Sequence, residues 1–148
     1  MAFCYFNTAH AIKVHDEVIG ASGGLYGIMK HGQLDSIFDF IQSDDYYPDV
    51  EHKLTYLFYS INTGHCFNDG NKRASIALSA YFLEINNLTF LISRFIEQME
   101  NIAVDVADNR IDKSLLEEII TSIIYEPDYS EELKLKIARA KFGESMGA

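Results

Sequence analysis

The sequence has few cysteines and few basic residues, and each shortage excludes a class of protein. Its two cysteines, Cys4 and Cys66, give neither a disulfide framework nor the ligand spacing of a zinc site, so we expect a reduced, cytoplasmic setting. Twelve lysines and arginines stand against 22 acidic residues, and the formal net charge is −10. This charge argues against direct nucleic-acid binding, which needs a basic face. It fits a soluble protein and favours a basic partner.

Long apolar segments and prolines are also scarce. The uncharged stretches fall far short of the about 20 apolar residues that span a bilayer, so we expect no membrane association. Residues 1–6 are apolar but lack the basic region and cleavage site of a signal peptide. The two prolines, Pro48 and Pro127, leave most of the chain free to form helices.

The length of 148 residues and the hydrophobic fraction of 48% fit one folded domain over residues 1–148. Apolar residues recur at helical spacing through most of the chain, which predicts an all-α fold of about seven helices. We expect helices over residues 9–19, 33–41, 50–62, 70–85, 95–106 and 114–124, and a last one ending near residue 142. A glycine-rich loop follows the first helix, and residues 88–92 are expected to be extended.

Several helix starts carry capping residues. Asp49 is placed to cap the helix that follows Pro48, and Asp112 or Ser114 the helix that begins there. Asp128 with Glu131 three residues later predicts a capping box for the last helix.

The segment from His65 to Arg73 differs most from its surroundings. It reads His-Cys-Phe-Asn-Asp-Gly-Asn-Lys-Arg and is followed by ten residues without charge. Between Leu54 and Ser93 the basic side chains are Lys72 and Arg73 alone. Such a concentration of polar groups at the start of an apolar helix predicts a functional site.

The start of this helix suits a phosphate. The first N–H groups of a helix have no internal partners, and the helix dipole places partial positive charge there. Gly70 allows a close approach of the backbone to an anion. Lys72 and Arg73 add two positive charges. We therefore predict a site that holds the phosphates of a nucleotide.

Asp69 and His65 complete the predicted chemistry. A lone carboxylate beside phosphates commonly holds Mg²⁺, although Asp69 acting only as an N-cap is the alternative. The imidazole of His65 can take a proton from a hydroxyl nucleophile. We interpret Phe67 as an apolar anchor of the loop and Cys66 as a packed spacer, since adjacent side chains diverge. The remaining four histidines receive no role: His10, His15, His31 and His52.

Residues 42–49 combine polar and aromatic side chains. An exposed connector between two helices is the ordinary interpretation. The alternative is a short flap that binds a partner through these residues: Gln42, Ser43, Asp44, Asp45, Tyr46 and Tyr47.

Residues 65–73 resemble the signature of the Fic/Doc family, which reads His-x-Phe-x-Asp/Glu-Gly/Ala-Asn-Gly/Lys-Arg-x-x-Arg. Upstream, Gly23-Gly24-Leu25-Tyr26-Gly27 and Gly32-Gln33-Leu34-Asp35-Ser36 are similar to the death-on-curing (Doc) branch. The resemblance covers roughly residues 10–120. It implies a compact Fic-type helical bundle.

Family members transfer part of a nucleoside triphosphate to a protein hydroxyl, and most are AMP transferases. The Doc branch has Lys where AMP transferases have Gly, and that position is Lys72 here. Doc-like proteins transfer the γ-phosphate, and elongation factor Tu is the known target. The resemblance therefore implies a Doc-like toxin kinase of a type II toxin–antitoxin system, which uses Mg²⁺ and ATP or another nucleoside triphosphate.

The resemblance also implies roles for individual residues. His65 is the base, Asp69 the Mg²⁺ ligand, and residues 42–47 the target-binding flap. Lys72 and Arg73 belong to the catalytic set. The implied phosphate contacts are Asn68, Gly70, Asn71, Lys72 and Arg73.

Two departures from the family pattern bear on the reaction. Ile76 stands where the full Fic signature has its final Arg, which argues against AMP transfer. Ser114 and Glu118 have the spacing of the family's inhibitory helix, but Ile119 follows where Gly or Asn belongs. The resemblance thus implies restraint by a separate antitoxin protein.

Three other functions remain open from the sequence. An AMP transferase is the principal alternative. A non-catalytic interaction module would keep the fold without the reaction. A metal nuclease would use His65, Asp69 and Asn71, but the acidic charge and the lack of a second cluster of metal ligands argue against it.

Overall fold

The chain folds into helices joined by short loops. The structure is a computed structural model that describes residues 2–143. In these residues it contains seven α-helices and one 3₁₀ helix, η1. Their bounds are α1 Thr8–Ser22, α2 His31–Phe40, α3 Val50–Gly64, α4 Asn71–Ile85, η1 Thr89–Leu91, α5 Ile92–Ala107, α6 Lys113–Tyr125 and α7 Glu131–Phe142. The predicted all-α fold of about seven helices is confirmed.

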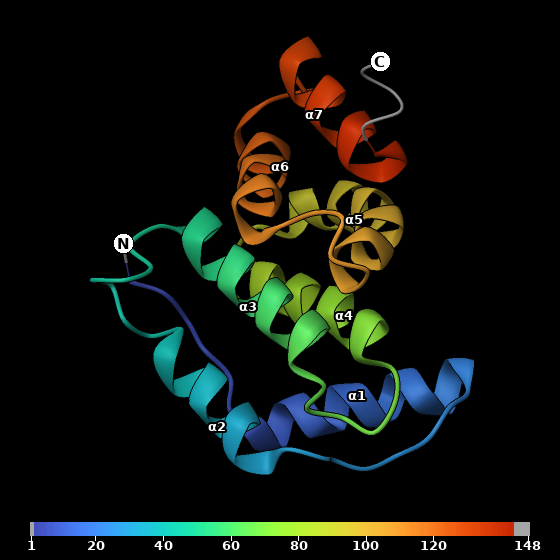
Figure 1. The fold of residues 1–148 in the computed structure, drawn as a ribbon. Coiled ribbons are helices and arrows are strands. Elements are labelled where there is room, and N and C mark those ends of the chain that lie inside the picture. The colour runs from blue at the N-terminus through green and yellow to red at the C-terminus, as the bar shows by residue number, and fades with distance from the viewer. Residues whose placement is uncertain (1, 144–148) are drawn as a thin grey trace.

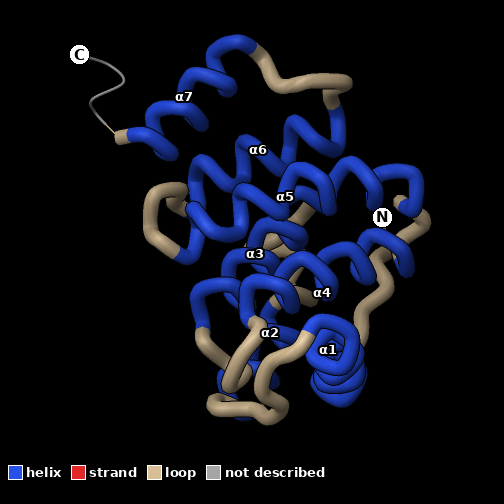
Figure 2. The backbone as a smooth tube through the Cα atoms, turned by 90° about the vertical axis from the view of Figure 1, so that its right-hand side faces the viewer, coloured by secondary structure: helices blue, strands red, loops and turns tan. Residues whose placement is uncertain are grey.

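Helices α3 and α4 form the centre of the bundle. They pack against each other along their lengths, and the loop between them carries residues 65–70 (Figure 1). Helices α5 and α6 cover one side of the pair, and α1 packs against α4 on the other (Figure 2). Helix α2 contacts α3 and α1, whereas α7 packs on α6 at the far end from α1. The loop of interest therefore lies at the end of the bundle where α1 and α2 meet the central pair.

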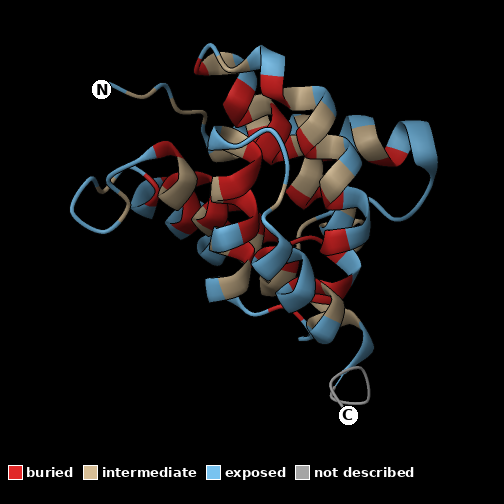
Figure 3. Cartoon of the chain, turned by 90° about the horizontal axis from the view of Figure 1, so that it is seen from above, coloured by how far each residue is buried: buried red, intermediate tan, exposed pale blue. Residues whose placement is uncertain are grey.

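The core follows from the apolar pattern of α3 and α4. Leu57, Phe58, Leu78 and Phe82 are all fully buried. The Phe58 ring meets the Phe95 ring of α5 edge to face, with the centroids 6.2 Å apart. Buried residues concentrate at the centre of the bundle, and exposed ones line its surface (Figure 3). Because α4 is enclosed by other helices, its first turn is held firmly in place.

Two local predictions are wrong. Residues 88–92, predicted to be extended, contain η1, because the Leu91 N–H bonds to the Leu88 carbonyl and the buried Leu91 side chain joins the core. Helix α7 has Ser130 as its N-cap, where the capping box of Asp128 and Glu131 was predicted. The Ser130 side chain accepts the Leu133 N–H at 3.1 Å. The sequence did not single out Ser130, because Asp128 and Glu131 beside it have the spacing of a capping box.

The other helix boundaries agree with the prediction or differ from it by one helical turn or less. Asp112 caps α6 by accepting the Leu115 N–H at 2.8 Å, and Asp49 lies at the N-cap of α3. Helix α3 continues through Gly64, where a break at residues 63–64 was expected, and ends at His65 in the left-handed conformation. Within residues 2–143 no helix is both long and apolar enough to cross a membrane.

Replacing Phe58 with alanine should lower the free energy of unfolding by about 3–5 kcal/mol, because the lost ring leaves a cavity in the core. Phe90 is 76% exposed, so Phe90→Ala is a matched control. It should change the free energy of unfolding by less than about 0.5 kcal/mol. Urea denaturation followed by circular dichroism measures both, and equal losses in the two variants would contradict the assigned core.

Candidate functional site

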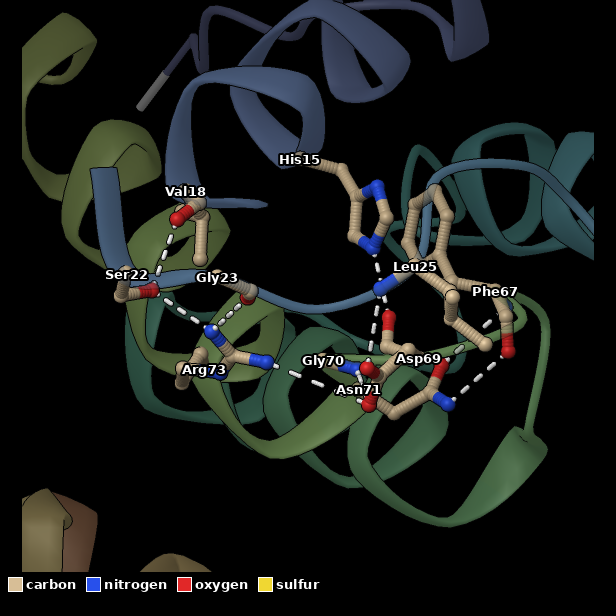
Figure 4. A network of polar contacts seen from close by, with 10 residues as sticks. All are labelled: His15, Val18, Ser22, Gly23, Leu25, Phe67, Asp69, Gly70, Asn71 and Arg73. Atoms are coloured by element: carbon tan, nitrogen blue, oxygen red, sulfur yellow. Dashed lines mark hydrogen bonds and ion pairs between the residues drawn. The ribbon is translucent and has the colours of Figure 1, made fainter. Parts of the chain in front are cut away.

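The loop between α3 and α4 is closed by its own residues. It contains two left-handed residues, His65 (φ 52°, ψ 39°) and Gly70 (φ 73°, ψ 23°). Asn71 brackets the backbone of Phe67: its Oδ1 accepts the Phe67 N–H at 3.1 Å, and its Nδ2 donates to the Phe67 carbonyl at 3.0 Å (Figure 4). The structure thus places Asn71, a predicted phosphate contact, in a role that holds the loop closed.

The N-terminus of α4 is open to an anion. Its N-cap is Gly70, which has no side chain to accept the N–H groups of the first turn. The unpartnered N–H groups of the first turn and the helix dipole favour negative charge here. Lys72 is exposed and forms no ion pair within residues 2–143. The structure therefore has the features of the predicted phosphate site: an uncapped helix start with a free cation on its first turn.

Asp69 lies beside this helix start without capping it. Its Oδ1 accepts the Gly70 N–H at 2.8 Å, and its Oδ2 accepts the Leu25 N–H at 3.0 Å. Arg73 Nη2 is 3.9 Å from Oδ1. The Leu25 and Gly70 N–H groups, assisted by the Arg73 guanidinium, hold the pKa of Asp69 below its usual value. Asp69 is therefore an ionised carboxylate at neutral pH.

Arg73 joins the end of α1 to the start of α4. Its Nη1 donates to the Ser22 hydroxyl at 2.6 Å and to the Gly23 carbonyl at 2.7 Å (Figure 4). Its Nη2 faces Asp69. The guanidinium thus lies next to the carboxylate, and part of its hydrogen-bonding capacity is used within the protein.

The residues present fit a Mg²⁺ ion that is shared with a phosphate. The Asp69 carboxylate is partly exposed, with 42% of the side-chain surface accessible. Mg²⁺ is usually bound through one or two carboxylates together with waters and substrate phosphates. Among residues 2–143, the one cluster of three potential metal ligands is Asp49, Glu51 and His52, at the other end of α3. Asp69 would therefore hold Mg²⁺ together with waters and phosphate oxygens rather than within a cluster of protein ligands.

A second loop lies against the motif and was not predicted as part of the site. Ile28 forms an antiparallel bridge with Phe67, and the Met29 N–H donates to the Cys66 carbonyl at 2.7 Å. The Asn68 N–H donates to the Gly27 carbonyl at 3.0 Å. We call residues 23–30 the glycine loop. The glycines at 20–27 and the Doc-like upstream segment were the available signals, but neither indicates pairing with residue 67.

The glycine loop approaches the motif too closely for side chains at two positions. A Cβ on Gly24 would lie 2.6 Å from Asp69 Oδ2, and one on Gly27 would lie 2.5 Å from Asn68 Nδ2. Both glycines have positive φ values, 120° and 106°. A side chain at Gly24 or Gly27 would therefore displace the Asp69 carboxylate or the Asn68 amide from its present position.

The remaining motif residues take distinct positions. His65 is exposed, and its side chain forms no hydrogen bond or ion pair within residues 2–143. Cys66 is fully buried, and burial raises the pKa of its thiol. Phe67 is 1% exposed and belongs to the core. The interpretations of Cys66 as a packed spacer and of Phe67 as an anchor are therefore confirmed.

Residues 42–49 lie away from the motif. They precede α3, whereas His65 ends it. Fifteen helical residues separate the two ends of α3 by about 22 Å at the helical rise of 1.5 Å per residue. Asp44 pairs with the buried Lys53 at 3.0 Å, and the Tyr47 ring stacks on Tyr56 at 4.3 Å. Tyr46 is 75% exposed. The structure does not bring residues 42–47 together with the catalytic candidates.

The geometry and the sequence comparisons agree on the class of this protein. A family model described as "Fic/DOC family" matches residues 5–83, more than half of the chain. The chain belongs to the Fic/DOC family. It is similar to the protein named "Protein kinase doc" of Escherichia phage P1, with 33% identity over 81 residues. The matched part is 52% of this chain and 64% of the relative, so the chain covers less than two thirds of that protein.

Replacing Gly24 with alanine should destabilise the protein more than replacing Gly23. Both glycines have positive φ, but a Cβ on Gly23 would have no atom within 4 Å. Each substitution carries the cost of the left-handed region, about 1–3 kcal/mol, and Gly24→Ala adds a clash with Asp69 worth about 1–3 kcal/mol. Urea unfolding of the two variants measures the difference. Equal losses of free energy of unfolding in the two variants would show that a Cβ at Gly24 does not clash with Asp69.

The lowered pKa of Asp69 predicts a pH-dependent contribution to stability. The ionised carboxylate stabilises the fold at pH values above its unfolded pKa of about 3.9, and this contribution is lost as the pH falls through the lower folded pKa. The difference in free energy of unfolding between the wild type and Asp69→Asn should be constant near neutrality and shrink below about pH 4. A difference that stays constant down to about pH 2 would contradict the assigned partners of Asp69.

Proposed function

We propose that this protein is a Doc-like toxin kinase that transfers the γ-phosphate of a nucleoside triphosphate to a hydroxyl group of a protein. The observation that carries the proposal is the uncapped start of α4, with the free Lys72 on its first turn and the Asp69 carboxylate beside it. Family membership and the similarity to a protein kinase support the same reaction.

The proposed roles follow from the positions of the side chains. The first-turn N–H groups of α4 and Lys72 would hold the phosphates and offset negative charge that develops on them. His65 is exposed at the other end of the loop, where a hydroxyl of a target protein can approach it. His65 would take the hydroxyl proton while the oxygen attacks the γ-phosphorus. The bond to the β,γ-bridging oxygen breaks, and the nucleoside diphosphate leaves.

Asp69 would hold Mg²⁺ together with the bound phosphates, and the ion would neutralise phosphate charge. Arg73 would contact phosphate through the donors that Ser22 and Gly23 leave free. Asn68 is exposed, and its Nδ2 donates to the Tyr26 carbonyl at 3.2 Å. Because the Asn68 N–H already donates to the Gly27 carbonyl, we propose that Asn68 contacts the nucleotide through the second hydrogen of Nδ2.

The glycine loop is the better placed candidate for recognition of the protein target. Leu25, Tyr26 and Met29 are 67%, 58% and 61% exposed, although they lie directly beside the motif. Residues 42–47 would require a target that reaches about 20 Å further along α3. We propose that the target contacts the glycine loop first and that residues 42–47 act, if at all, as a distal contact.

The proposed setting is a toxin–antitoxin system in the cytoplasm. A translation factor such as elongation factor Tu is the proposed target, and a separate antitoxin protein the proposed inhibitor. The acidic charge of −10 suits basic surfaces on either partner. AMP transfer remains the second candidate because most of the family performs it. Ile76, which stands in place of the final Arg of the Fic signature, packs against the hydrophobic core and offers no cation for AMP transfer.

Labelled ATP distinguishes the two reactions. Incubated with a cell extract and Mg²⁺, the protein should transfer label from the γ-phosphate and not from the α-phosphate. His65→Ala should lower the rate at least about 100-fold because the general base is lost. His31→Ala is the matched control, since His31 is exposed and pairs with Asp35 on α2.

Label from the α-phosphate alone would establish the AMP transferase instead. Cleavage of plasmid or transfer RNA without labelling would indicate the nuclease, and neither activity the interaction module.

A further inference from the structure

His15 lies beneath the motif loop although it belongs to α1, fifty residues earlier in the chain. Its side chain is 1% exposed. We propose that His15 is a positioning residue that holds the Asp69–Gly70 peptide in the orientation required for phosphate binding. The proposal rests on the proposed function, because it names the residue that prepares the phosphate site.

Two contacts join the His15 ring to the loop. The ring stacks on Phe67 with a centroid distance of 3.9 Å and an angle of 4° between the planes. Its Nε2 lies 2.6 Å from the Asp69 carbonyl oxygen (Figure 4). A carbonyl oxygen only accepts, so Nε2 carries the hydrogen and donates it. One ring thus packs against the loop and also donates a directed hydrogen bond to it.

The hydrogen bond sets the orientation of a single peptide plane. In a trans peptide the C=O and N–H groups point in opposite directions. Because the Asp69 carbonyl points at His15, the Gly70 N–H points away from α1, and it donates to Asp69 Oδ1 at 2.8 Å. This peptide immediately precedes the uncapped first turn of α4.

Gly70 cannot maintain this orientation by itself. Its φ of 73° is one of several conformations that glycine adopts with similar ease. A Cβ on Gly70 would lie 3.5 Å from His15 Nε2 and 3.0 Å from Ile19 Cδ1, so the loop backbone sits directly on α1. The glycine allows the close approach, and His15 restricts the peptide to one of the available orientations.

The stacking and the hydrogen bond can be separated by substitution. His15→Phe keeps a flat ring against Phe67 but removes the donor. His15→Gln removes the ring but can place an amide donor near the position of Nε2. His10→Phe is the matched control, because His10 is also on α1 and stacks on Tyr81, with centroids 4.4 Å apart, away from the motif.

We expect His15→Phe to weaken Mg·ATP binding about threefold to tenfold, because the Asp69–Gly70 peptide is no longer held in one orientation, and to lower the melting temperature less than His15→Gln does. His15→Gln should have a lower melting temperature and retain wild-type affinity within about twofold, since the donor is restored. His10→Phe should bind as the wild type does. Isothermal titration calorimetry measures affinity and differential scanning fluorimetry the melting temperature. The proposal would be overturned if the variant with the lowest melting temperature also had the weakest affinity, because the loss of binding would then reflect lost stability alone.

Nitrogen-15 NMR tests the same hydrogen bond in the absence of nucleotide, first in the unsubstituted protein and then in His15→Phe. Histidine ring spectra should show the hydrogen of His15 on Nε2, and the Gly70 amide signal should shift in His15→Phe. A hydrogen on Nδ1 alone would overturn the proposal even if a variant does not fold. If the wild type binds no Mg·ATP, the proposed function fails, and the NMR result still decides whether His15 orients the peptide.

Discussion

The candidate site depends on the attachment of the loop between α3 and α4 to α1. The His15 ring stacks on Phe67 and bonds to the Asp69 carbonyl, and Arg73 bonds to the end of the same helix. These contacts surround the left-handed Gly70, which has no side chain to cap the first turn of α4. Because an uncapped helix start favours an anion, the phosphate site that we propose depends on the packing of α1 against this loop.

Basic side chains gather at the start of α4, although the protein as a whole is acidic. The formal net charge is −10, yet Lys72 and Arg73 stand together on the first turn of α4. Asp69 is the acid beside them, and its carboxylate is already stabilised by two backbone N–H groups. The start of α4 is thus locally positive on an acidic molecule, which is consistent with the nucleotide site proposed above.

Much of the fold and the core of the site could be predicted from the sequence. Helical periodicity identified the helices, because burial on one face imposes apolar spacing on each of them. The motif from His65 to Arg73 was recognisable because its charges are local in sequence. The prediction of extended structure at residues 88–92 failed because the short apolar segment there is equally compatible with a 3₁₀ turn packed on the core.

The sequence by itself determined the all-α class and singled out the nine motif residues as candidates, since both depend on neighbours within a few positions. Only the tertiary structure decided what surrounds them. His15 and Leu25 of the glycine loop contact Asp69 from 54 and 44 residues earlier in the chain, whereas residues 42–47, closer in sequence, lie at the opposite end of α3. Periodicity shows which face of a helix is buried but not what it is buried against. The packing of α1 on α4 therefore had to be seen before the support of Asp69 and Gly70 could be assigned.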